Sequence, residues 1–164
     1  MNDIEPWMRG PLAGVEPFVQ PLFFSFTQVR EDLARFTEGI TQEQLWRRVG
    51  TLPTLGFHLR HIAGSVDRLT AYLMEESLSA EQLAFLKEEG TPGATLAELL
   101  AAIDASLNAT EARVRTLDPA TILDARYIGR KRLPTTVLGL LVHLAEHTQR
   151  HLGQAITTAK LVRG

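Results

Sequence analysis

The chain has 164 residues, of which 45% are hydrophobic and 22% charged, and this composition fits one globular domain with a sizeable core. A formal net charge of −2 argues against a general nucleic-acid or anionic-membrane binder, because such proteins present a strongly basic face. The chain has no cysteine, which excludes disulfides, thiolate metal sites and a cysteine nucleophile, so any metal must bind to histidine and carboxylate side chains.

The first residues contain neither the pattern of a signal peptide nor a stretch long enough to span a membrane, so we expect a cytoplasmic protein. Prolines and glycines between positions 6 and 14 interrupt helical periodicity. Residues 1–13 are therefore expected to form an irregular N-terminal arm, with Trp7 packed on the body of the protein.

Hydrophobic residues recur at intervals of three and four in four long stretches, a periodicity typical of amphipathic helices. These stretches span residues 15–38, 54–75, 95–117 and 134–160. Pro21 should kink the first helix or delay its start.

Two short helices are expected between the long ones. Thr41 and Gln44 form a capping pattern that predicts a helix ending near Trp46. A second short amphipathic helix is expected over residues 79–89, where Ser79 provides the N-terminal cap.

Residues 122–133 lack helical periodicity and predict an extended loop or a small hairpin around Gly129. This segment carries four basic residues, which are either solvated or in contact with an anion or substrate: Arg126, Arg130, Lys131 and Arg132. The whole pattern predicts an all-α, up-and-down four-helix bundle in a single domain, residues 1–164, with room for one longer crossover. Short connecting helices and an extended loop before the last helix complete this prediction.

Three of the five histidines, His143, His147 and His151, lie four residues apart in the last helix. Side chains at this spacing lie one above the other, so two imidazoles can converge on one ion. The apolar arc of this helix includes His151, has His147 near its edge and leaves His143 towards the rim. A histidine on a helix is usually a surface or hydrogen-bonded core residue, but several unpaired imidazoles on an apolar face would be costly. The pattern therefore indicates half of a metal site.

The second long helix carries the other two histidines, His58 and His61, at a spacing that allows one to bind a metal and the other to support it. Periodicity slightly favours His58 as the inward residue, and either residue alone could equally be a partly exposed polar group. Glu146 and Gln154 flank the histidines of the last helix, but Glu146 points away from the arc of His151 and has at most a supporting role. No general base is identifiable from the sequence.

Two segments, Leu55-Gly-Phe-His-Leu-Arg-His-Ile-Ala-Gly64 and His143-Leu-Ala-Glu-His-Thr-Gln-Arg-His-Leu-Gly-Gln154, resemble the DinB-like family. This resemblance covers most of the chain and implies a four-helix bundle that binds a divalent metal through three histidines. The histidine before Ile-Ala-Gly corresponds to His61, and the pair before Gly-Gln corresponds to His147 and His151. The resemblance thus selects His61 where periodicity favours His58.

One departure from the family pattern is Leu152, where many relatives have a basic residue or a histidine. We also expect the small residues Ala63 and Gly64 to let the last helix approach the second. His58 and His143 remain candidates to support or replace a ligand.

Characterised relatives include metal-dependent transferases that use low-molecular-weight thiols, and others resemble hydrolases. The resemblance therefore implies a metal-dependent enzyme, with a transferase joining such a thiol to an electrophilic small molecule as the first choice. A metal-dependent hydrolase and a non-catalytic metal-binding stress-response protein are the alternatives. Three histidines leave open positions on zinc or nickel, which we expect first, or on iron or manganese. The expected partners are a small-molecule substrate and a second copy of the chain in a homodimer.

Overall fold

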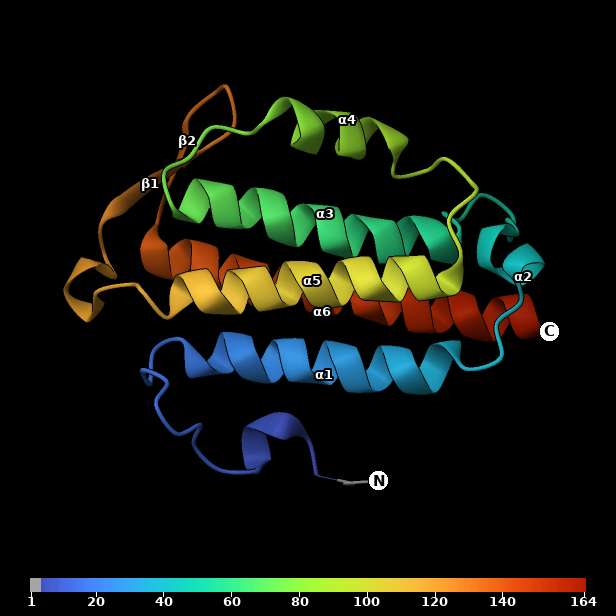
Figure 1. The fold of residues 1–164 in the computed structure, drawn as a ribbon, viewed down its shortest axis with the longest axis horizontal. Helices are drawn as coiled ribbons and strands as arrows, with labels where there is room; N and C mark the ends of the chain where they lie inside the picture. The colour runs from blue at the N-terminus through green and yellow to red at the C-terminus, as the bar shows by residue number, and fades with distance from the viewer. Residues whose placement is uncertain (1–3) are drawn as a thin grey trace.

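Four long helices lie side by side in the computed structural model, which describes residues 4–164 (Figure 1). They are α1 (Gln20–Thr37), α3 (Leu55–Leu73), α5 (Leu96–Val114) and α6 (Val137–Arg163). The shorter elements are η1 (Pro6–Met8), α2 (Gln42–Trp46), α4 (Ala80–Glu88), η2 (Pro119–Thr121), β1 (Ala125–Ile128) and β2 (Leu133–Thr136). The predicted all-α bundle with short connecting helices is confirmed.

Side-chain caps fix where most of these helices begin. A threonine or serine before each of five helices accepts a hydrogen bond from a backbone N–H of the first turn: Thr41, Thr54, Ser79, Thr95 and Thr136. Such bonds satisfy N–H groups that have no partner within the helix. The first long helix begins at Gln20 and not near position 15, with Pro21 in its first turn, so the expected delay is confirmed.

The direction of the helices differs from a simple up-and-down bundle. In Figure 1, α1 and α6 run in one direction, while α3 and α5 both run in the opposite direction. The segment that contains α4 makes this possible, because it returns the chain along the outside of α3 before α5 begins. The single crossover that the sequence left room for is therefore this segment.

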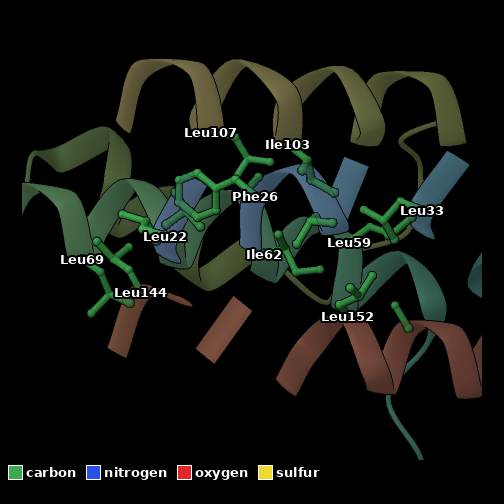
Figure 2. Packing of buried hydrophobic residues seen from close by; sticks show 14 of the residues in the cluster. Leu22, Phe26, Leu33, Leu59, Ile62, Leu69, Ile103, Leu107, Leu144 and Leu152 are labelled. Carbon is green, nitrogen blue, oxygen red and sulfur yellow. The ribbon is translucent and has the colours of Figure 1, made fainter. Parts of the chain in front are cut away.

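The core lies between the four long helices. Figure 2 shows side chains from all four meeting there, among them Leu22, Phe26, Leu59, Ile62, Ile103, Leu107, Leu144 and Leu152. Each fully buried side chain of this size stabilises the fold by roughly 1.5–3 kcal/mol. The helix α3 packs against both α5 and α6, so α3 and α6 are antiparallel neighbours along most of their length.

The segment before the last helix is an antiparallel hairpin with a register from Ala125 opposite Thr136 to Ile128 opposite Leu133. Gly129 begins its turn with a φ of 65°, a conformation that favours glycine. The side chain of Arg126 donates from Nε to the carbonyl oxygen of Leu73, at 2.8 Å, and so ties the hairpin to the end of α3.

The three other basic residues of this segment, Arg130, Lys131 and Arg132, are exposed. The guanidinium of Arg132 lies over the ring of Tyr127, 4.3 Å from its centroid. Their contact with an anion or substrate remains a prediction.

The N-terminal segment does not place Trp7 as expected. Its side chain is 62% exposed, and its Nε1 donates a hydrogen bond to Glu5 within the same segment. A bidentate ion pair between Arg9 and Glu31, at 2.5 and 2.7 Å, anchors this segment to α1 instead. The expected packing of the tryptophan is therefore wrong, and the first three residues of the predicted arm lie outside the described residues.

Within residues 4–164, no helix combines the length and the apolar character that a bilayer span requires.

Candidate metal centre

The antiparallel helices α3 and α6 bring three histidines together. Each of His61, His147 and His151 offers one ring nitrogen, and these nitrogens all lie within 4.8 Å of one another. The Nε2 atoms of His61 and His147 are 3.1 Å apart, and the ring centroids of His61 and His151 are 4.2 Å apart. The structure thus places in one cluster the three residues that the resemblance selects.

The spacing of one pair of these nitrogens matches that of two ligands on a divalent metal ion. Metal–nitrogen distances of about 2.0–2.1 Å place two ligand nitrogens about 2.8–3.4 Å apart at octahedral or tetrahedral angles. The 3.1 Å between Nε2 of His61 and Nε2 of His147 lies inside that range. Two lone pairs that face each other at this distance repel unless a proton or a cation lies between them. The donor set, three imidazoles without a thiolate, suits zinc, nickel, iron or manganese.

The protonation of the cluster also favours a cation. Burial, and then the positive charge of His61, lowers the pKa of His147 to about 4, and the same causes lower the pKa of His151 to about 4. Both imidazoles are therefore neutral at pH 7 and have a lone pair to share.

A carboxylate fixes the orientation of His61. Nδ1 of His61 lies 2.7 Å from Oε2 of Glu89, the residue that follows α4. An ionised carboxylate only accepts hydrogen bonds, so Nδ1 carries a proton, and when the ring has no second proton, Nε2 keeps its lone pair for the cluster. The other oxygen of Glu89 accepts a bond of 2.8 Å from Nη2 of Arg68.

Glu89 is an unusual residue to bury, since an unpaired carboxylate in the interior costs several kcal/mol. Only 3% of its surface is exposed. Burial raises the pKa of Glu89, but hydrogen bonds and positive charge from His61 and Arg68 lower it more, and the resulting pKa lies below the ordinary value. Glu89 is therefore ionised at neutral pH. Sequence reasoning missed this residue, because a glutamate at the end of a short helix carries no signal of burial.

His58 lies behind the cluster and not in it. It is 3% exposed, and its Nδ1 lies 3.5 Å from Nδ1 of His151, at the outer limit for a hydrogen bond. Burial, followed by the positive charge of His61, lowers its pKa to about 4. Periodicity was therefore right that His58 is the inward residue, and this buried residue lies next to Nδ1 of His151.

His143 lies next to the cluster but outside it, with its ring centroid 5.2 Å from that of His147. Nδ1 of His143 lies 2.7 Å from Oε1 of Glu146, and Arg150 donates to the other oxygen of the same carboxylate at 2.6 Å. Both partners of Glu146 lie on the exposed surface of α6, and Gln154 is also exposed. In the part of the chain that the structure describes, no hydrogen bond joins Glu146 or Gln154 to the three histidines of the cluster.

Gly64 has a different role from the one expected. A Cβ atom at this position would meet Nη1 of Arg68, the ring of Phe85 and Oε1 of Glu89 at 2.7–2.8 Å. The missing side chain therefore makes room for the segment around α4, and not for α6. The prediction that Gly64 lets the last helix approach is therefore wrong, because the segment that approaches Gly64 is the one around α4.

The tautomer of His147 is less constrained than that of His61. Its Nδ1 is buried and has no hydrogen-bond partner among residues 4–164.

The side chain of His61 is 17% exposed, so the cluster lies at the edge of the core and is accessible from solvent. Three imidazole ligands in such a position would leave coordination positions of an ion open to a small molecule.

The sequence model of the DinB superfamily matches residues 25–155, which include every residue of the cluster and its supporting groups. No curated protein matches the chain in a sequence comparison. The family match covers well over half of the chain, and the helical bundle and the three-histidine cluster agree with it. The chain therefore belongs to the DinB superfamily.

Proposed function

We propose that this protein is a metal-dependent transferase that joins a low-molecular-weight thiol to an electrophilic small molecule. The observation that carries the proposal is the cluster of His61, His147 and His151, whose nitrogens lie within 4.8 Å of one another at the edge of the core. We assign these three residues as the metal ligands, with zinc or nickel as the first candidates and iron or manganese as the alternatives.

When bound, the ion would act as a Lewis acid that favours the deprotonated form of a thiol or of water near neutral pH. The residues of the chain prepare the site for it. Glu89 holds the proton on Nδ1 of His61, and burial keeps His147 and His151 neutral, so protons compete little for their lone pairs at pH 7. The chain has no cysteine, so the thiol in the proposed reaction comes from a substrate.

In the proposed reaction, the thiol sulfur forms a bond with an electrophilic carbon. The bond between that carbon and its leaving group breaks, the leaving group departs with the electron pair, and the thiol proton passes to solvent. No oxidant or reductant is consumed. The chemical demand on the protein is thus limited to lowering the pKa of the thiol and holding it near the second substrate.

The proposal is tested with protein loaded with zinc or nickel, a panel of small thiols that includes cysteine and glutathione, and 1-chloro-2,4-dinitrobenzene as electrophile. We expect metal-loaded protein to accelerate formation of the thioether, and chelated protein or the His147→Ala variant to lose that activity. His143→Ala is the matched control, because this histidine lies on the same helix but outside the cluster. Equal rates in loaded and chelated protein would reject the proposal.

The same preparation separates the alternatives. Metal-dependent hydrolysis of 4-nitrophenyl acetate without any added thiol, together with no thioether formation, would replace the transferase with a hydrolase. A bound ion that raises thermal stability but supports neither reaction would indicate a non-catalytic metal-binding protein.

A further inference from the structure

The helix α4 contributes little to the hydrophobic core. None of its residues Ala80–Glu88 is buried, and its large apolar side chains, Leu83, Phe85 and Leu86, are 37–43% exposed. A helix that buries so little apolar surface gains little stability from its own packing. The one buried group that the helix brings to the bundle is the carboxylate of Glu89, directly after its last residue.

Polar contacts hold the end of α4 in a defined place on α3. Nη1 of Arg60 donates to the carbonyl oxygens of Glu88 and Thr91, at 2.5 and 2.6 Å, on either side of Glu89. At the other end of the helix, Gln82 donates from Nε2 to Asp67 at 2.8 Å. These bonds fix the backbone that carries the carboxylate.

Two features then aim the carboxylate at His61. Arg68 holds Oε1 of Glu89 at 2.8 Å, which leaves Oε2 to accept from Nδ1 of His61 at 2.7 Å. The absence of a side chain at Gly64 provides the space, since a Cβ there would lie 2.8 Å from Oε1 of Glu89. A crossover needs neither a buried carboxylate nor a buried arginine, so the connection between α3 and α5 does not by itself explain this arrangement.

We infer that Glu89 is a positioning residue for the metal centre, and that α4 delivers it to Nδ1 of His61. Glu89 fixes the Nδ1–H tautomer and the ring orientation of His61, so that the Nε2 lone pair points into the three-histidine cluster. Carboxylates that accept from the far nitrogen of a metal-binding histidine have this effect in general, and their loss typically lowers metal affinity about 10–100-fold. The inference rests on the metal site of the proposed function, but it does not depend on which reaction the site supports.

The first test uses metal-free protein and long-range ¹H–¹⁵N NMR of the histidine rings, which reports the tautomer directly. We expect His61 to carry its proton on Nδ1 in the wild-type protein and in Glu88→Gln. Glu88 is the matched control, because it is the preceding residue in the chain and is exposed, and its carboxylate accepts from Thr91. In Glu89→Ala, we expect His61 to lose its preference for Nδ1–H.

The second test measures zinc affinity by competition with a chromophoric chelator. Glu89→Ala should bind zinc about 10–100-fold more weakly than Glu88→Gln. Glu89→Gln should fall between the two, because its amide oxygen still accepts from Nδ1–H but lacks the charge. Gly64→Ala should weaken binding with all histidines and Glu89 in place, because the new methyl group displaces the carboxylate.

Glu89→Gln and Gly64→Ala keep the test decisive if Glu89→Ala does not fold. The inference is overturned if the folded variants keep both the Nδ1–H tautomer and a zinc affinity within twofold of Glu88→Gln, even if their melting temperature falls. That result would leave α4 and Glu89 with a structural role only. Failure of the transferase proposal gives a different result, namely normal zinc binding in the wild-type protein without thioether formation.

Discussion

Replacing His58 and His61 separately by alanine should affect metal binding very differently, although the two residues are three positions apart on α3. His61 offers a nitrogen to the cluster, whereas His58 is buried outside it, and its Nδ1 lies 3.5 Å from Nδ1 of His151. We expect His61→Ala to lower metal affinity at least as much as His147→Ala. His58→Ala should have the smaller effect.

The size of each effect follows from the role of the residue. Structural sites with four ligands bind zinc with a free energy of about 10–16 kcal/mol, or roughly 2.5–4 kcal/mol per ligand. Loss of His61 should therefore weaken metal binding about 10²–10³-fold. Loss of His58 removes only a long contact to a ligand. Loss of a residue that supports a metal ligand typically lowers metal affinity about 10–100-fold. Because His58 is 3.5 Å from His151, we expect His58→Ala to lower the affinity about 10-fold or less.

Zinc titration in competition with a chelator measures both variants, and circular dichroism at 222 nm verifies that they remain helical. His143→Ala is the control for the removal of a histidine outside the cluster, and its affinity should equal that of the wild-type protein. Tight binding retained by His61→Ala but lost by His58→Ala would refute the reasoning. In that case helix phase would identify the ligand better than the cluster geometry does.

Three further predictions concern stability and association. The pKa values of His58, His147 and His151 are lowered to about 4 from 6.5, so between these values the unfolded chain binds more protons than the folded one. The free energy of unfolding of metal-free protein should therefore be constant above pH 6.5 and fall towards pH 4. His58, which is fully buried, should alone account for about 3 kcal/mol of this decrease. A free energy of unfolding that does not change with pH in urea denaturation would contradict this. Glu75 has a φ of 60° after the end of α3, a conformation that favours glycine, so Glu75→Gly should raise the free energy of unfolding by about 0.5–1 kcal/mol. A decrease would show that the exposed carboxylate of Glu75 contributes more to stability than the relief of backbone strain. We also predict a homodimer. Val142 is 58% exposed on α6, so Val142→Asp should shift sedimentation towards the 18.2 kDa monomer. A wild-type protein that sediments only as a monomer would reject the dimer.

The helices were predictable because their signals are local. Capping residues such as Thr41 and Ser79 mark helix starts through bonds within one turn, and the structure has these bonds. The parallel course of α3 and α5 was not predictable, because no local pattern specifies on which side the crossover returns. No local pattern decides between a loop and a hairpin around Gly129 either, so the sequence left both possibilities open.

The candidate site was predictable only in part. Helix periodicity reports burial, and it correctly placed His58 inside. A residue at the edge of the core, such as His61, is not the most buried residue of its helix, so periodicity does not select it. The resemblance to a family supplied that choice. Glu89 lies 21 residues after Arg68 and 28 residues after His61, and it meets both only through the path of the crossover. Such a contact depends on tertiary structure and leaves no periodic pattern in the sequence.

Elemental analysis of protein purified without chelators and without a metal-affinity step shows whether His61, His147 and His151 bind a metal ion. We predict close to one divalent ion per chain, with zinc or nickel as the first candidates. The His61→Ala, His147→Ala and His151→Ala variants should lose that ion while their helical spectrum remains. His143→Ala should keep its ion. Metal content that is negligible in the wild-type protein, or equal in the wild-type protein and the three variants, would contradict the account.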